Sequence, residues 1–233
     1  MLTLHEHPFA SYCWKVLIAL YEREVPCERH FVGDQPDRER LAELWPLASI
    51  PVLVDAEAGL VLPESTPIIE YLDRFGDAPP LVPADPDAAL RARLWDRICD
   101  GQVMTPLQKI VGDSLRPEGR GDPEGVAQAR EQLDRAYALL DQHLAARASD
   151  PAPVWSSAQS LPWAAGSAFT LADCAAAPSL FYARIVQRWD EERLADLTRY
   201  FEAVTARPAV ARVIEEAREY RHLFPLPWPD YAD

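Results

Sequence analysis

Residues 49–72 read S-I-P-V-L-V-D-A-E-A-G-L-V-L-P-E-S-T-P-I-I-E-Y-L, and this stretch indicates the fold of the first part of the chain. Two short apolar runs, 52–54 and 60–62, flank a turn that contains Gly59, a pattern typical of a β-hairpin. Ser65 then precedes apolar residues at helical spacing, so we expect it to cap a helix. The stretch therefore predicts two paired strands followed directly by a helix.

The residues before this stretch alternate between strand and helix patterns. An extended apolar stretch at 1–5 is followed by a predicted helix over 11–24, a strand over 27–32 and a short polar helix over 37–45. The predicted order over residues 1–76 is therefore βαβαββα. One parallel crossover and one hairpin give a mixed four-stranded sheet with helices on its faces.

A proline-rich linker follows the predicted sheet domain. Residues 77–87 contain four prolines, a composition that breaks helices and stiffens the chain. Beyond the linker, residues 88–233 carry apolar residues mainly at helical spacing. We therefore expect an all-helical second domain, which begins with a long helix over 88–115 that Pro106 kinks.

The rest of the second domain contains a distinctive helix start. Thr170 and Asp173 are spaced as a capping box, in which each side chain can bond to the backbone of the other residue. Phe169 can pack on Cys174 across the same turn. Further helices are predicted over 123–147, 190–206 and 208–219, with a loop over 148–168 and a proline-rich tail that straps the surface.

Composition and charge exclude several classes of function. The chain has 233 residues and a formal net charge of −14, which repels nucleic acids and anionic membranes. No apolar run approaches the roughly 20 residues that a membrane helix needs, and no secretory signal is visible. The four cysteines and five histidines show no metal-ligand spacing. We therefore expect a cytoplasmic protein with reduced cysteines, no bound metal and no nucleic-acid or membrane partner.

Four stretches, in the family's own order, resemble cytosolic glutathione S-transferases. Residues 7–20 (H-P-F-A-S-Y-C-W-K-V-L-I-A-L) are similar to the family's first strand-to-helix turn, and residues 49–55 (S-I-P-V-L-V-D) to its cis-proline loop. Residues 63–72 (P-E-S-T-P-I-I-E-Y-L) are similar to its Glu-Ser motif, and residues 169–178 (F-T-L-A-D-C-A-A-A-P) to its helix capping box. The resemblance implies a thioredoxin-like domain that binds glutathione, followed by an all-helical domain. It also implies a two-fold homodimer.

The resemblance assigns most of the glutathione site to two short segments. It implies that Glu64 pairs with the ammonium of the γ-glutamyl end, and that Ser65 holds its carboxylate at a helix start. Ile50-Pro51 matches the family's cis-proline step, which implies that the backbone of Ile50 pairs with the cysteinyl part of glutathione.

Activation of the glutathione thiol is the first departure from the family pattern. The thiolate is the nucleophile, and a thiol with a pKa near 8.5 is mostly protonated at neutral pH. The family lowers this pKa with a Ser, Tyr or Cys near the start of the first helix, but the usual Ser or Cys position is Ala10 here. Ser11 is the favoured substitute, although it could instead cap the helix. Tyr12 remains open, and so does Cys13, which is more simply a core residue.

A second departure is at Ser49. The family often has a lysine here that binds the glycyl carboxylate, so Ser49 is expected to line the site without supplying a charge. An arginine from elsewhere must then serve, or the affinity falls. Trp14 and Lys15 in the first helix are near enough to be considered.

The resemblance also implies a pocket for a second substrate between the two domains. The residues expected to line it are Phe9, Ala10, Met104, Thr105 and Gln108. An apolar and aromatic lining suits a hydrophobic electrophile.

These observations predict a glutathione transferase that conjugates the glutathione thiolate to a hydrophobic electrophile, with glutathione as co-substrate and no metal. One alternative is a glutathione-dependent disulfide or peroxide reductase, or an ether-cleaving or isomerising enzyme of the same fold. Another is a non-catalytic scaffold that binds a ligand or a protein, because one fold hosts many functions.

Overall fold

The structure, a computed structural model, describes residues 1–145 and 163–232. The first part of the chain has the predicted βαβαββα order. Its elements are β1 (Leu2–Glu6), α1 (Ser11–Glu22), β2 (Glu28–Phe31), α2 (Gln35–Leu44), β3 (Val52–Asp55), β4 (Leu60–Pro63) and α3 (Ser65–Leu72).

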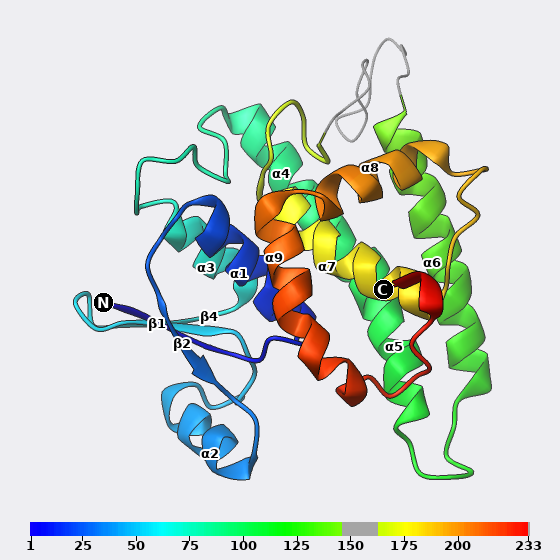
Figure 1. The fold of residues 1–233 in the computed structure, drawn as a ribbon, viewed down its shortest axis with the longest axis horizontal. Helices are drawn as coiled ribbons and strands as arrows, with labels where there is room; N and C mark the ends of the chain where they lie inside the picture. Colours follow the sequence, from blue (N-terminus) through cyan, green and yellow to red (C-terminus); the bar gives the residue numbers. More distant parts are fainter. Residues whose placement is uncertain (146–162, 233) are drawn as a thin grey trace.

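The four strands form one mixed sheet in the order β2-β1-β3-β4. β1 is parallel to β2 and antiparallel to β3, and β3 pairs with β4 as the predicted hairpin. Helices α1 and α3 cover one face of the sheet, and α2 covers the other (Figure 1). Beneath α2, Leu41 packs in a small separate core with Val32 and Val52. The predicted thioredoxin-like fold of this part is confirmed.

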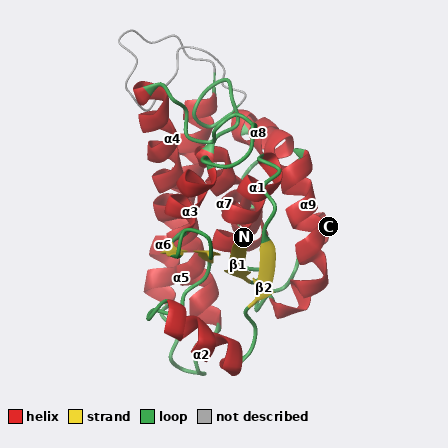
Figure 2. Cartoon of the chain, turned by 90° about the vertical axis from the view of Figure 1, so that its left-hand side faces the viewer, coloured by secondary structure: helices red, strands yellow, loops and turns green. Residues whose placement is uncertain are grey.

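The second part of the described chain is helical, as predicted. Most of its helices run side by side (Figures 1 and 2). The elements are α4 (Pro86–Ile98), the π-helix η1 (Cys99–Met104), α5 (Thr105–Ser114), α6 (Pro123–Leu144), α7 (Leu171–Val186), α8 (Ala195–Thr205), α9 (Pro208–Ala217) and the 3-10 helices η2 (Arg218–Leu223) and η3 (Asp230–Ala232). Within residues 1–145 and 163–232, no helix is both long and apolar enough to cross a membrane.

The long helix expected over 88–115 is instead three consecutive segments. α4 ends at Ile98, the π-helix η1 follows, and α5 begins at Thr105. Pro106 lies in the first turn of α5, which continues η1 without a break, so its missing N–H falls at the junction of the π and α segments. Instead of the kink that was predicted at Pro106, the helix has a π segment in the turn before this residue.

Other predicted boundaries differ by a few residues. The helix expected over 190–206 begins at Ala195, because residues 191–194 form turns. The helix expected over 123–147 is described to Leu144, and residues 146–147 and most of the loop over 148–168 lie outside the described residues. The tail, expected to hold no helix, ends in the short 3-10 turn η3.

The capping box at the start of α7 forms as predicted. The carboxylate of Asp173 accepts the backbone N–H of Thr170 at 2.8 Å, and it also accepts the Tyr200 hydroxyl at 2.7 Å and the Ala164 N–H at 2.8 Å. Burial raises the pKa of Asp173 to about 6. Phe169 and Cys174 are both buried beside this turn, so the site anchors α7 in the core.

Candidate functional site

The turn between β1 and α1 carries the residues expected to activate a thiol. Ala10 is the N-cap of α1 and Ser11 is its first residue, with no side-chain capping bond. The alternative in which Ser11 caps the helix is therefore wrong, because the serine stands one residue inside the helix. A hydroxyl at this place lies beside the free N–H groups of the first turn, where a negative charge is stabilised.

The side chains after Ser11 point to different environments. Tyr12 lines the cavities described below, and burial raises the pKa of its phenol, which stays neutral and able to donate. Cys13 is fully buried, and burial raises the pKa of its thiol. Cys13 is therefore a protonated core residue, which leaves Ser11 and Tyr12 as the groups that can donate a hydrogen bond to a thiolate.

The loop before β3 contains the expected cis peptide bond, between Ile50 and Pro51. Ser49 precedes this bond, and its hydroxyl accepts the indole N–H of Trp45 at 3.1 Å. Ser49, Ile50 and Pro51 all line the same cavity. The loop whose backbone is expected to pair with glutathione, at Ile50, therefore borders a cavity.

The turn between β4 and α3 positions Glu64 and Ser65. Glu64 is the N-cap of α3 with φ 71°, a left-handed backbone conformation that is uncommon for a residue other than glycine. Ser65 is the first residue of α3 and is buried, so the prediction that it caps the helix is wrong. The first N–H groups of a helix have no partner within it, and Ser65 and Thr66, at the start of α3, both line the cavity described below.

A polar cavity of about 450 Å³ brings these segments together. It is bounded by residues of α1, the cis-proline loop, the start of α3, the end of α4 and η1: Tyr12, Ser49, Ile50, Pro51, Glu64, Ser65, Thr66, Pro67, Arg97 and Asp100. All five residues predicted to bind glutathione line it. Two carboxylates and one guanidinium face the same space, which suits a ligand that carries charges of both signs.

An apolar cavity of about 360 Å³ adjoins the polar one, and the two share Tyr12 and Ile50. Its lining residues are Phe9, Ala10, Ser11, Tyr12, Ile50, Met104, Leu107, Gln108, Val111, Tyr182, Leu223, Phe224 and Pro225. Four of the five residues predicted for the second-substrate pocket are among them. Thr105 is not, because it is exposed and its hydroxyl donates to the Asp100 carbonyl at 3.0 Å.

A buried ionic cluster supports the wall between the domains. The Lys15 ammonium lies 2.8 Å from a carboxylate oxygen of Asp96 and 2.8 Å from one of Asp100. Thr66 joins α3 to the cluster by donating to Asp96 at 2.8 Å. Burial acts to lower the pKa of Lys15, but the two carboxylates outweigh it and raise the pKa. Lys15 is therefore engaged in the core and is not available for a glycyl carboxylate.

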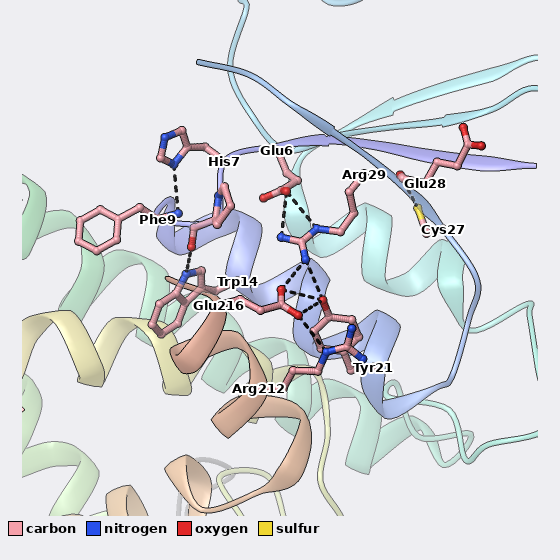
Figure 3. Close-up of polar contacts among 11 residues, drawn as sticks. Glu6, His7, Phe9, Trp14, Tyr21, Cys27, Glu28, Arg29, Arg212 and Glu216 are labelled. Atoms are coloured by element: carbon pink, nitrogen blue, oxygen red, sulfur yellow. Dashed lines mark hydrogen bonds and ion pairs between the residues drawn. The ribbon is translucent and has the colours of Figure 1, made fainter. Parts of the chain in front are cut away.

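Trp14 is likewise excluded as a carboxylate ligand. It is fully buried, and its indole N–H donates to the Pro8 carbonyl at 2.6 Å (Figure 3). Its ring packs against Phe181 and Tyr182 of α7, with centroids 5.1 and 5.0 Å apart. Trp14 therefore holds the β1–α1 turn against the helical domain.

Sequence reasoning missed several residues that line the two cavities. Arg97 and Asp100 face the polar cavity, and Tyr182 and Phe224 wall the apolar one. The spacing of Asp96 and Asp100, four residues apart on a helix, was a usable signal that both carboxylates share a face. The tail residue Phe224 carried no such signal, because its place depends on the chain folding back over α7.

The chain matches two family models. The model described as the N-terminal domain of glutathione S-transferase matches residues 9–74, and that of the C-terminal domain matches residues 123–216. Together they span most of the chain, and the first includes every segment that lines the polar cavity except the end of α4 and η1.

Two curated relatives illustrate the range of similar proteins. A stringent starvation protein A homolog of Coxiella burnetii is 33% identical over 181 residues, which covers 78% of this chain and 75% of that protein. Glutathione S-transferase GstB of Escherichia coli is 27% identical over 221 residues, which covers 92% of this chain and 98% of that protein.

Solved structures agree with these matches. A glutathione S-transferase from Methylobacillus flagellatus, crystallised with glutathione bound, has a TM-score of 0.77 and 26% identity. The alignment covers 91% of this chain and 98% of that one, so the fold is shared through both parts of the molecule.

Proposed function

Because the chain belongs to the glutathione S-transferase superfamily, we propose that it is a glutathione transferase that joins the glutathione thiol to a hydrophobic electrophile. The observation that carries the proposal is the pair of adjoining cavities, one polar and one apolar, which meet at Tyr12 and Ile50. A thiol placed at this junction faces both a binding site for its own molecule and a pocket for a second substrate.

The polar cavity suits the γ-glutamyl end of glutathione, which carries an ammonium and a carboxylate. Glu64 and Asp100 supply negative charge for the ammonium. Arg97 and the N–H groups at the start of α3 supply positive potential for the carboxylate. The backbone of Ile50 then pairs with the cysteinyl part, which directs the thiol toward α1.

The start of α1 stabilises the thiolate in this proposal. Ser11 donates its hydroxyl to the sulfur, and the positive end of α1 adds a favourable potential. Each hydrogen bond to the charged form lowers the pKa of the thiol and so increases the ionised fraction at neutral pH. The chemistry needs no group from the protein to become covalently attached, since glutathione is itself the nucleophile.

The electrophile occupies the apolar cavity. Phe9, Tyr182 and Phe224 form an aromatic wall, in which the ring centroid of Phe9 lies 5.5 Å from that of Tyr182 and 6.1 Å from that of Phe224. Ser11 and Gln108, with the hydroxyl of Tyr12, are polar groups of the lining. A flat apolar substrate fits such a site, where a few polar groups orient it for attack.

Calorimetric titration with glutathione in two buffers of different ionisation enthalpy tests the proposal. We expect binding with release of protons near neutral pH, because the site favours the thiolate, followed by turnover of at least one electrophile in a screen. Absence of glutathione binding would contradict the proposal outright. A Ser11→Ala variant provides the control, since it should bind glutathione and release fewer protons.

A second candidate is a non-catalytic regulator that keeps the fold. The similarity to a stringent starvation protein A homolog, at 33% identity, favours it. The same titration separates the two functions. Glutathione binding without proton release, and without turnover of any electrophile, supports the regulator, whereas efficient turnover excludes it.

We further propose that the chain acts as a two-fold homodimer, as the family resemblance implies. Light scattering after size-exclusion chromatography tests this at micromolar concentration. A mass near 26.2 kDa, that of one chain, would contradict the dimer.

A further inference from the structure

A third cavity has Glu6 and Pro8, where β1 leads into the β1–α1 turn, among its lining residues. It has a volume of about 310 Å³ and is bounded by strands β1 and β2 and by the end of α9 with η2. Its lining residues are Glu6, Pro8, Arg29, Phe31, Glu216, Glu219 and Tyr220. It shares none of its lining with the polar or the apolar cavity.

The lining of this cleft holds an incompletely paired carboxylate. Glu6 is only 2% exposed, and one of its oxygens accepts two bonds from Arg29, at 3.1 and 3.0 Å. The other oxygen, Oε2, is buried without a hydrogen-bond partner. It points away from Arg29, on the side of His7 (Figure 3). An unpaired buried acceptor is unfavourable, so a donor that reached it would be bound favourably.

Carboxylates outnumber cations around the cleft. The lining carboxylates are Glu6, Glu216 and Glu219. The guanidiniums beside them are that of Arg29 in the lining and that of Arg212, which pairs with Glu216 from outside it, so the formal charge is −1 when all three carboxylates are ionised. Arg29 is already paired with both Glu6 and Glu216, as Figure 3 shows. Burial acts to raise the pKa of Glu216, but hydrogen bonds from Arg29, Arg212 and Tyr21 outweigh it and lower the pKa. Glu216 is therefore ionised at neutral pH.

Aromatic rings also line the cleft. The rings of Phe31 and Tyr220 are stacked with centroids 6.0 Å apart and an angle of 26° between their planes. His7 lies 4.8 Å from Phe31 and 5.4 Å from Tyr220, and burial lowers its pKa, so its ring carries no charge that would repel a cation. A Cβ at Gly33 would overlap the Phe31 ring, so glycine at 33 allows this position of the ring.

We propose that this cleft is a binding site for a primary alkylammonium group, held by the carboxylates of Glu6 and Glu219 with its alkyl chain against Phe31 and Tyr220. Glu216, whose oxygens already accept from Arg29, Arg212 and Tyr21, positions Arg29 and does not contact the ammonium. An ammonium nitrogen supplies the N–H donor that Glu6 Oε2 lacks. Its positive charge matches the carboxylate excess, and an aromatic face attracts a cation and packs against methylene groups. An anion would meet the same carboxylates and be repelled.

The alkylammonium can come from a free amine or from a lysine side chain. We would titrate the full chain, by calorimetry at fixed ionic strength, with n-butylammonium as the free amine and with Nα-acetyl-lysine methylamide as the lysine source. Neutral 1-butanol serves as the uncharged analogue. Saturable binding of either cation, with none by 1-butanol, supports the site, and the tighter cation identifies the source.

Matched variants locate the binding in the cleft. Glu219→Gln removes an exposed lining carboxylate, whereas Glu215→Gln removes one from the same region that lies outside the lining. We expect Glu219→Gln to weaken cation binding by about threefold or more and Glu215→Gln to leave it unchanged. Phe31→Leu, which keeps an apolar wall but removes the ring, should also weaken it by about threefold.

Three results would overturn the proposal. Neither cation binds saturably, 1-butanol binds as tightly as n-butylammonium, or the two glutamate variants weaken binding equally. The last result would mean that the cations follow only the negative net charge of the chain. Since no glutathione is present in these titrations, they are independent of the transferase proposal.

Discussion

Glu64 combines an uncommon backbone conformation with a charged side chain at the edge of the polar cavity. We expect Glu64→Gln to raise the KM for glutathione by about tenfold, because the ammonium of the ligand loses one charged partner. The KM for the electrophile should not change. Steady-state kinetics with each substrate varied in turn checks this, with Glu57→Gln, an exposed carboxylate in the β3–β4 turn, as the matched control. Equal effects of the two variants would contradict the role of Glu64.

Ser11 is the second residue whose role can be measured directly. Ser11→Ala should raise the pKa of the bound thiol and lower kcat/KM about 10- to 100-fold, the usual worth of a hydrogen bond to a charged group. Ultraviolet absorbance of the bound thiolate across a pH series reports the pKa. Tyr12→Phe is the matched variant, since Tyr12 is the other hydroxyl near the junction. A loss with Tyr12→Phe alone would move the role to the tyrosine.

At the scale of residues, short local motifs indicate which residues meet at one cavity, and the binding roles of those residues stay predictions. Ile50, Pro51, Glu64 and Ser65 meet at one cavity, as their short motifs imply. The choice between capping and cavity lining at Ser11 could not be made, because it depends on a shift of one residue at the start of the helix. Arg97 was missed, since an arginine on a long helix gives no sign of facing a distant loop.

Among the elements, the junction of α1, α3 and α4 depends on the Lys15 cluster. Lys15→Met leaves Asp96 and Asp100 buried together without their cation, which should lower the free energy of unfolding by about 3–5 kcal/mol. Burial raises the pKa of Asp100, and Lys15, which opposes this rise, is lost in the variant, so the folded variant binds more protons than the unfolded state. The difference in unfolding free energy between Lys15→Met and the unsubstituted protein should therefore shrink as the pH falls.

Urea denaturation of both forms at several pH values measures this effect. Lys109→Met is the matched control, because Lys109 is the other lysine of the chain and forms a partly exposed pair with Asp122. Lys109→Met should lower the free energy of unfolding by less than about 1 kcal/mol. A Lys15→Met deficit as small as that of Lys109→Met would show that the cluster contributes little.

The start of α7 gives the second prediction at the scale of elements. The pKa of Asp173, about 6 in the folded state, lies above the roughly 3.9 of an unfolded aspartate. Stability from this group is therefore fully present below the unfolded pKa and is lost as the pH rises through 6. Between pH 7 and pH 5 the unfolding free energy should gain about 1 kcal/mol from it. Urea denaturation at pH 7 and pH 5 should show no such rise in the unfolding free energy of Asp173→Asn. If the rise persists in this variant, a group other than Asp173 causes it.

Secondary-structure elements were predictable where periodicity and capping agree. The hairpin of β3 and β4 and the capping box of α7 follow from residues close in sequence. The π-helix η1 does not, because the residues Cys99–Met104 have no pattern that separates it from an ordinary helix. Pro106 indicates that the helix must adjust nearby, but packing against α6 and α7 decides where.

At the scale of the whole molecule, the tail completes the apolar cavity. Leu223, Phe224 and Pro225 line it, and the tail is fixed by a bond of 2.9 Å from the Tyr231 hydroxyl to the Arg184 carbonyl. Phe224→Ala should raise the KM for an aromatic electrophile about tenfold and leave glutathione binding unchanged. Steady-state kinetics checks this, with Leu115→Ala, an exposed leucine outside the cavity, as control. An unchanged KM would mean that the tail does not contact the substrate.

The Lys15 cluster also limits how such a chain can be recombined with its relatives. Its cation comes from the first part of the chain and its two carboxylates from the second, so neither half can be exchanged alone without leaving a buried charge unmatched. A chimera that takes residues 1–76 from a relative with an uncharged residue in place of Lys15 would keep Asp96 and Asp100 buried side by side without a cation. The two domains can therefore be exchanged between relatives only when Lys15, Asp96 and Asp100 are present together in the product.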